Sequence, residues 1–137
     1  MPKKQLLQKE RHLFYLGKTS SSVYIFGGQS IYNPNVFVDG VSFWNISKDG
    51  TLIDRKSYFT QMPEPRSDHC SVGYTGNIVF IIGGQTTGST MMLESLLYNL
   101  KSSTFVKVFS LSRSRLNPTC NIVGEKIVIA GGMTKNG

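Results

Sequence analysis

An apolar run rich in β-branched residues and closed by two glycines occurs three times along the chain. The copies are Val23-Tyr24-Ile25-Phe26-Gly27-Gly28, Ile78-Val79-Phe80-Ile81-Ile82-Gly83-Gly84 and Ile127-Val128-Ile129-Ala130-Gly131-Gly132. The steps from Gly27 to Gly83 and from Gly83 to Gly131 are 56 and 48 residues. A period of about 50 residues is longer than that of most helical repeats and favours a repeated β unit.

Each run lacks the alternation of polar and apolar residues that marks a half-exposed strand. A continuous apolar run of this length indicates a strand buried on both faces. We expect residues 78–82 to be the most buried segment of the chain. We also expect each glycine pair to end its strand, because glycine allows positive φ and a close approach of other groups.

Three further strands accompany each complete run. A shorter strand and a turn precede it, an aromatic residue followed by Asn marks a third strand after it, and a fourth follows a polar turn. The expected first strands are residues 12–16, 68–74 and 118–123; the third strands contain Trp44-Asn45 and Tyr98-Asn99; the fourth strands are residues 52–59 and 104–109. The pattern predicts ten antiparallel strands and no helix from residue 12 onward.

One segment inside the repeat has the composition of a helix. Residues 91–98 are rich in Met, Leu and Glu, which favour helices. Their place in the repeat corresponds to the third strand, so we predict a strand there.

The second copy resembles a kelch repeat, with the opening Pro65-Arg66-Ser67-Asp68-His69 and the later residues Gly83-Gly84, Glu94, Tyr98 and Phe105. In that family each repeat is one blade of a β-propeller. Phe105 stands where the family usually has Trp, and the third copy has Asn117-Pro118-Thr119 in place of the Arg-x-x-His opening. The structural motif residues that the resemblance assigns are Gly27, Gly28, Trp44, Gly83, Gly84, Glu94, Tyr98, Phe105, Gly131 and Gly132.

The resemblance implies an all-β fold, a partial kelch-type β-propeller of about two and a half four-stranded antiparallel blades. We expect residues 1–11 to form a basic tail or a short helix, 12–62 the first blade, 63–111 the second, and 112–137 the first half of a third. Propellers close with about 4 to 8 blades. We therefore expect closure to need further blades in the same chain or self-association.

Composition and charge narrow the function classes. The net charge is +7, but five of the 15 Lys and Arg residues lie within the first 18 positions and the others are scattered. A nucleic-acid-binding surface usually has a dense stripe of basic residues with aromatic residues between them. We therefore expect no nucleic-acid partner. No stretch approaches the roughly 18 apolar residues of a membrane span, so we expect no membrane partner and a cytoplasmic location.

Two cysteines, Cys70 and Cys120, are too few for a disulfide framework or a zinc site. They occupy equivalent first-strand positions in neighbouring blades, which diverge around the propeller axis. We expect both to be reduced and unreactive. His69 and Cys70 are adjacent on a strand and point to opposite faces, which argues against a nucleophile–base pair.

The sequence contains no phosphate-binding loop, dinucleotide fingerprint, nucleophile elbow or paired carboxylates at short spacing. We predict no catalytic residue, metal or cofactor. Arg66 and Glu94 are candidates for a buried ion pair between two strands; the alternative is that Arg66 reaches solvent and binds an acidic group.

Strand direction predicts the binding face. In an antiparallel blade, the loop after each Gly-Gly and the loop entering the next blade emerge at the same end. Segments 29–35, 64–68, 85–90 and 112–117 should therefore lie together. Their candidate partner-binding residues are Tyr32, Arg66, Ser67, Gln85, Arg113 and Arg115.

Aromatic and Arg side chains among adaptable polar residues are typical of protein-recognition sites. The resemblance to kelch propellers, which commonly bind peptide segments of other proteins, also favours a protein-interaction scaffold. The arginines favour an acidic or phosphorylated peptide. Two alternatives remain: a piece of a sugar-processing propeller enzyme of epimerase or oxidase type, or a gene fragment without independent function.

Overall fold

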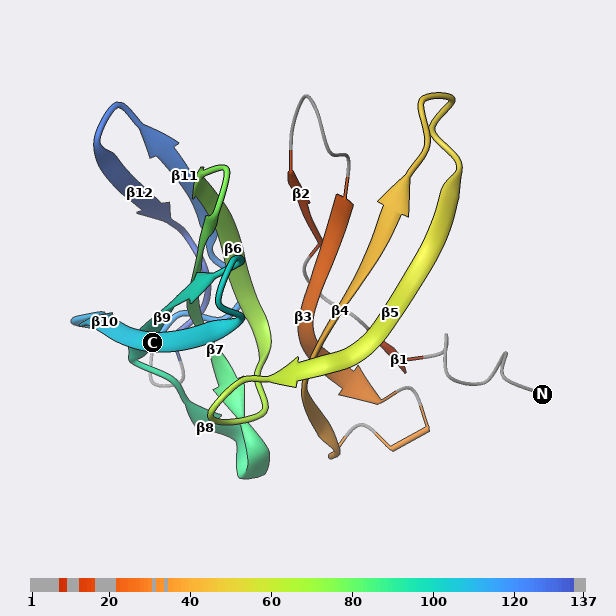
Figure 1. The fold of residues 1–137 in the computed structure, drawn as a ribbon. Coiled ribbons are helices and arrows are strands. Elements are labelled where there is room, and N and C mark those ends of the chain that lie inside the picture. Colours follow the sequence, from red (N-terminus) through yellow and green to blue (C-terminus); the bar gives the residue numbers. More distant parts are fainter. Residues whose placement is uncertain (1–7, 10–12, 17–21, 31, 34, 135–137) are drawn as a thin grey trace.

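The computed structural model describes residues 8–9, 13–16, 22–30, 32–33 and 35–134, with backbone alone at 8–9, 13–16 and 52–59. The described residues form an all-β fold in which every strand pair is antiparallel. Figure 1 shows three sheets side by side. In the described part of the chain these sheets do not close into a ring.

The first sheet has the order β1-β3-β4-β5, and β2 pairs with β3 beside β1. Its strands are β1 (Gln8–Lys9), β2 (Leu13–Leu16), β3 (Ser22–Ser30), β4 (Phe37–Ile46) and β5 (Leu52–Gln61). Residues 8–9 were expected in a tail or short helix and instead pair with β3. The other residues of that segment, and His12, lie outside the described residues.

The second sheet repeats this arrangement with the order β10-β9-β7-β6, and β8 pairs with β7 beside β9. Its strands are β6 (Ser67–Thr75), β7 (Ile78–Thr86), β8 (Thr90–Met91), β9 (Glu94–Asn99) and β10 (Thr104–Ser110). The hairpin of β11 (Thr119–Val123) and β12 (Lys126–Ala130) forms the third sheet.

All ten predicted strands are present, and the described residues contain two additional short ones, β1 and β8. Residues 91–98 contain the end of β8 and most of β9 rather than a helix, so the position in the repeat overrides helix propensity there. The described helical structure is a single 3-10 turn, Thr87–Ser89. Within the described ranges, no helical segment has the length and hydrophobicity needed to cross a bilayer.

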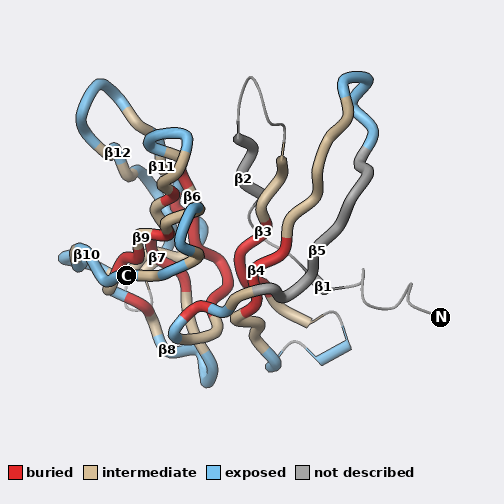
Figure 2. The backbone as a smooth tube through the Cα atoms, in the orientation of Figure 1, coloured by how far each residue is buried: buried red, intermediate tan, exposed pale blue. Residues whose placement is uncertain are grey.

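Strand β7 is the centre of the packing, because its two faces contribute to two hydrophobic clusters. Val79 and Ile81 pack with Phe26 and Val41 of the first sheet. Ile82 packs toward the β11–β12 hairpin, in a cluster that includes Cys120, Ile122, Ile127 and Ile129. In β7 the predicted burial on both faces is met at Val79, Ile81 and Ile82 (Figure 2). The third run does not meet it, because the residues of β12 alternate between exposed and half-buried.

The longest buried run nevertheless lies elsewhere, at residues 66–70, so the prediction that 78–82 is the most buried segment is wrong. Ile78 and Phe80 are only half-buried. Residues 66–70 lie where the chain enters β6, which contacts the first sheet through β2 and β3 and the hairpin through β11.

The aromatic residues of the repeat pack across the interface between the first two sheets. Tyr98 is fully buried, with its ring 5.3 Å from that of Phe26 and 4.6 Å from that of Phe105. Phe105 therefore fills apolar volume beside the third-strand aromatic. Trp44 is half-buried on β4, where it pairs with Val23.

Each glycine pair was predicted to end its strand, but the first two pairs do not. Gly27-Gly28 and Gly83-Gly84 lie inside β3 and β7, each with positive φ. A Cβ on Gly27 would overlap the carbonyl oxygen of Arg66, and one on Gly84 would overlap that of Ser67. Gly27 is thus required because the segment that enters the second sheet passes directly over it, and Gly84 because the start of the paired strand β6 lies against it.

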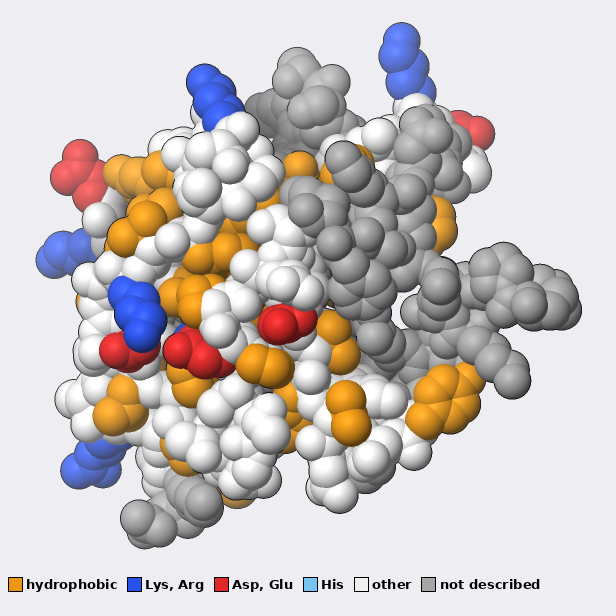
Figure 3. Space-filling view, turned by 60° about the horizontal axis from the view of Figure 1, so that its bottom comes forward, with side chains coloured by type: hydrophobic (Ala, Val, Ile, Leu, Met, Phe, Trp, Pro, Cys, Tyr) orange, Lys and Arg blue, Asp and Glu red, His pale blue; other side chains and the backbone are white. Residues whose placement is uncertain are grey.

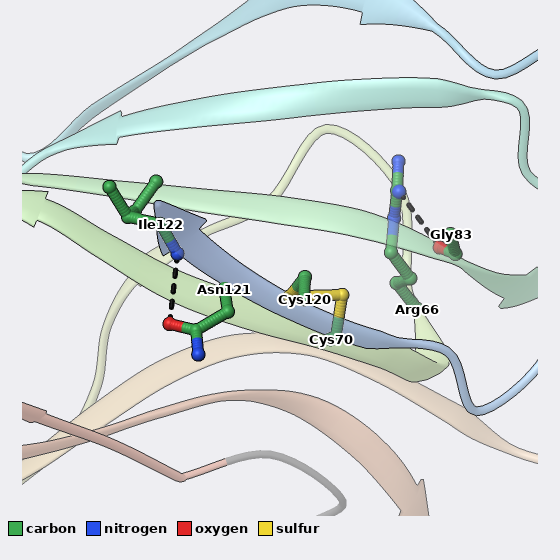
Figure 4. The surroundings of a disulfide bond; sticks show 6 residues. All are labelled: Arg66, Cys70, Gly83, Cys120, Asn121 and Ile122. Carbon is green, nitrogen blue, oxygen red and sulfur yellow. Dashed lines mark hydrogen bonds between the residues drawn. A yellow bond between two sulfur atoms is a disulfide. The ribbon is translucent and has the colours of Figure 1, made fainter. Parts of the chain in front are cut away.

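The expectation of reduced cysteines is also wrong. Cys70 of β6 and Cys120 of β11 form a disulfide, with their Cα atoms 6.0 Å apart (Figure 4). Neighbouring sheets were expected to diverge, but their first strands are close here, and β6 contacts β11 along the same interface. The bond covalently joins the hairpin to the second sheet.

Candidate functional site

The loop between β3 and β4 is held in shape by its own polar groups. Ser30 Oγ accepts hydrogen bonds from the backbone N–H groups of Tyr32, at 3.2 Å, and Asn33, at 3.3 Å. Asn33 Oδ1 accepts one from the N–H of Asn35, at 3.0 Å. Asn and Ser stabilise such turns because their short side chains reach nearby backbone amides.

The corresponding loop of the second sheet turns back on β7. Its 3-10 turn contains Gly88 at φ 75°, and β8 then pairs with Gln85 and Thr86. The N–H of Met92 donates to the carbonyl of Gly84 at 3.0 Å and anchors the far end of the loop. The loop therefore projects from the same end of its sheet as the β3–β4 loop does from the first.

A groove of about 450 Å³ lies between these two loops. It is lined by amide and hydroxyl side chains together with one aromatic ring and one glycine: Gln29, Asn35, Phe37, Gln85, Thr87, Gly88 and Ser89. None of these side chains is ionisable. The end of the molecule that carries the loops is turned toward the viewer in Figure 3, where uncharged side chains separate a few charged ones.

Gln85 is positioned by a carboxylate beneath it. Its Nε2 donates to Oδ2 of the buried Asp68 at 2.8 Å, and Ser67 Oγ donates to the same oxygen at 3.2 Å. Asp68 has φ 56°, a conformation that Asp and Asn adopt more readily than most residues. The start of β6 thus orients one wall of the groove.

Arg66 joins the first and second sheets behind this wall. Its carbonyl accepts the N–H of Gly28 at 2.9 Å, and its Nη1 donates to the carbonyl of Gly83 at 3.0 Å. The side chain is fully buried. Burial lowers the pKa of Arg66 to about 10, against the opposing effect of the carboxylates of Glu64 and Glu94.

The expected ion pair between Arg66 and Glu94 is not formed among the described residues. Glu94 pairs instead with Lys107, whose Nζ lies 2.7 Å from its Oε2. That hydrogen bond, and the charge of Glu94, raise the pKa of Lys107. Glu94 therefore acts on Arg66 only at longer range, and the alternative, an Arg66 exposed to solvent, is excluded by its burial.

Arg115 repeats the arrangement of Arg66 at the next junction. Its carbonyl accepts the N–H of Gly84 at 2.8 Å, and its Nη1 donates to the carbonyl of Gly131 at 2.7 Å. Asn117 follows it as Asp68 follows Arg66, with a similar φ of 54°. Sequence comparison with the kelch opening missed this equivalence; an Arg followed two residues later by Asp or Asn is the signal that would have found it.

The sequence-predicted site residues divide into three groups. Tyr32 is 65% exposed on the β3–β4 loop, Gln85 lines the groove, and Arg113 is exposed. Arg66 and Ser67 are fully buried, so their assignment to a partner-binding surface does not hold in this structure. Arg115 is half-buried and held by Gly131.

The loops lie together at one end of the molecule, as predicted. The groove joins the two loops after Gly-Gly, and the entry segments containing Arg66 and Arg115 bind the glycines next to them. The individual lining residues Asn35, Thr87 and Ser89 were not singled out, although they lie in predicted loops. Phe37 could not be found in this way because it begins β4.

No group of three or more His, Cys, Asp or Glu residues in the described ranges is arranged to hold a metal ion. A comparison of the sequence with protein-family models gives no match, and a comparison with curated proteins gives none either.

Proposed function

We propose that this chain is part of a kelch-type β-propeller that acts as a protein-interaction scaffold, and that the groove between the β3–β4 and β7–β8 loops binds an extended peptide of a partner protein. The threefold repeat and the successive antiparallel sheets support the propeller architecture. The groove is the observation that carries the binding function.

The groove chemistry suits a peptide main chain. The amides of Gln29, Asn35 and Gln85 offer both donors and acceptors, as the peptide bond does, and Phe37 offers an apolar contact. Because the lining has no ionisable side chain, hydrogen bonding is favoured over proton transfer, which supports a binding role over a sugar-processing one.

The expected preference for an acidic or phosphorylated peptide rested on three arginines, and two of them are held within the fold. Arg66 is buried, and Arg115 already donates to Gly131. Arg113 is exposed on a segment that packs against Gly84, next to Gln85. An acidic residue would therefore be recognised at the rim by Arg113, where a charge mainly increases the association rate.

Selection from a random peptide library on the full chain tests the proposal. A peptide selected in this way should lose at least tenfold in affinity for the Asn35→Ala/Ser89→Ala variant, about 1.4 kcal/mol. The Asn77→Ala/Lys101→Ala variant, altered at the opposite turns, is the matched control and should bind normally. Loss of binding in the control variant with retention in the groove variant would refute the assignment of the binding face.

A further inference from the structure

Gln85 meets the groove through its side chain. At this residue β7 is paired on both sides, with Ser67 of β6 and with Met91 of β8. The chain then turns away through the 3-10 turn Thr87–Ser89. The side chain of Gln85 is half-buried and lines the groove. A ligand in the groove therefore contacts Gln85 at its amide group.

A carboxylate decides which end of that amide faces the groove. Nε2 of Gln85 donates to Oδ2 of Asp68 at 2.8 Å. An ionised carboxylate has acceptors and no donor, so turning the amide over would set Oε1 against another acceptor. The oxygen and the nitrogen of a planar amide diverge from one carbon. Because Nε2 is directed to Asp68 below, Oε1 is directed away from it, toward the groove.

Asp68 is itself held through its side chain and its backbone. It is 7% exposed, and its Oδ2 also accepts the hydroxyl of Ser67 at 3.2 Å. Its carbonyl accepts the N–H of Asn117 at 2.8 Å. A carboxylate held in this way orients the Gln85 amide before any ligand arrives, so a ligand does not have to order that side chain on binding.

An acceptor fixed in this orientation favours one kind of ligand group. A peptide N–H donates to Oε1 of Gln85, whereas a proline nitrogen or an ester oxygen has no hydrogen to donate. A ligand without a donor at this point leaves Oε1 covered and unpaired, which costs binding free energy.

We propose that Asp68 determines the specificity of the groove by fixing the Gln85 amide, so that the groove selects an extended peptide with a free N–H opposite Gln85 over one with proline or an ester there. This inference rests on the proposed function, peptide binding in the groove. Asp68 is a positioning residue, because it acts on the ligand through Gln85. Its effect should therefore be on the choice between ligands.

The peptide selected on the full chain is the probe, together with its ester analogues, each of which has one backbone N–H replaced by oxygen. The position opposite Gln85 is the one at which the ester loses affinity in the native chain but not in the Gln85→Met variant. There the native chain should bind the parent peptide about tenfold or more tighter than the ester.

In the Asp68→Asn variant the same ratio should fall below about threefold. An amide at this position either accepts from Nε2 of Gln85 or donates to its Oε1, so it no longer fixes the orientation. The variant should fold, because Asn117 has nearly the same φ in the hairpin, 54° against 56° for Asp68. Asp49→Asn is the matched control: it makes the same chemical change in the turn between β4 and β5, at the opposite end, and should keep the native ratio.

Side-chain NMR of the chain without peptide tests the orientation itself. One Nε2 proton of Gln85 should be shifted downfield and exchange slowly in the native chain and in Asp49→Asn, and should lose both properties in Asp68→Asn. Failure to select any peptide that depends on Asn35 and Ser89 would refute the proposed function and this inference with it. A groove-binding peptide whose ester penalty is the same in the native chain and in Asp68→Asn, a peptide with no ester penalty that depends on Gln85, or a Gln85 amide signal unaffected by Asp68→Asn would overturn the inference alone.

Discussion

Single polar residues set the local geometry of several turns. In the turn between β4 and β5, the Asp49 carboxylate accepts hydrogen bonds from the Ser47 hydroxyl and from the Thr51 N–H, the latter at 3.0 Å. Ser47 Oγ in turn accepts from the Thr51 N–H at 3.2 Å. The β9–β10 turn is stabilised in the same way, because Asn99 Oδ1 accepts hydrogen bonds from the N–H groups of Lys101 and Ser102.

These hydrogen bonds hold the pKa of Asp49 at about 2, with the Ser47 hydroxyl as the largest cause. Since the folded-state pKa is depressed, the contribution of Asp49 to stability is present above its ordinary pKa of 3.8 and is lost as the pH falls through about 2. Ser47→Ala should raise the Asp49 pKa toward 3.8, as followed by carboxyl-carbon NMR. Ser110→Ala, at an exposed site away from the turn, should leave it unchanged; equal effects of the two changes would contradict the assignment.

At the scale of the element, the glycine pairs let other backbone segments approach β3 and β7 closely. Gly84 has φ 87° and lies against the backbone of Ser67 and His69, where a Cβ would overlap. Gly88 has φ 75° but nothing within 4 Å of a Cβ position. Substitutions at these two positions therefore distinguish the free-energy cost of a positive φ from that of close packing.

Gly88→Ala should lower the free energy of unfolding by about 1 to 2 kcal/mol, the cost of an L-residue in the left-handed region. Gly84→Ala adds a clash with backbone that cannot move without disturbing β6, and should cost about 3 kcal/mol or more. Urea unfolding of both variants measures the difference. Equal losses would show that packing over Gly84 is looser than the structure has it.

At the scale of the molecule, stability depends on how the three sheets are joined. The first two share a cluster that contains Phe26, Ile81 and Tyr98, all fully buried. The hairpin packs through a cluster whose members are mostly half-buried, and the Cys70–Cys120 disulfide supplements it. Disulfides form and persist in oxidising surroundings, so this bond bears directly on the expectation of a reducing cytoplasm.

Removing the disulfide with Cys70→Ser/Cys120→Ser should lower the free energy of unfolding by about 2 to 4 kcal/mol, because the bond restricts the unfolded chain between two residues far apart in sequence. Amide exchange should rise most in β11 and β12. A reductant should have the same effect on the native protein and none on the double variant. If the reductant leaves the native protein unchanged, the disulfide contributes nothing to holding the hairpin.

The sequence by itself determined the all-β fold and the positions of the strands, because uninterrupted Val/Ile/Phe runs and polar turns between them are local signals. The repeat was strong enough to overrule the helix-forming composition of residues 91–98. It also indicated the end of the molecule where the loops gather, since antiparallel strands alternate in direction. That is why Gln85, near the end of β7, and Tyr32, in the β3–β4 loop, were found.

Only the tertiary structure decided which of the candidate residues face solvent and which lie between sheets. Arg66 and Arg115 are each followed two residues later by Asp or Asn, yet Arg66 is enclosed by the first two sheets whereas Arg115 stays half-buried at the hairpin. The disulfide likewise depends on how closely β6 approaches β11, a distance between sheets that no local pattern encodes. Strand propensity and burial pattern depend on neighbours along the chain, whereas these contacts depend on residues brought together from about 50 positions away.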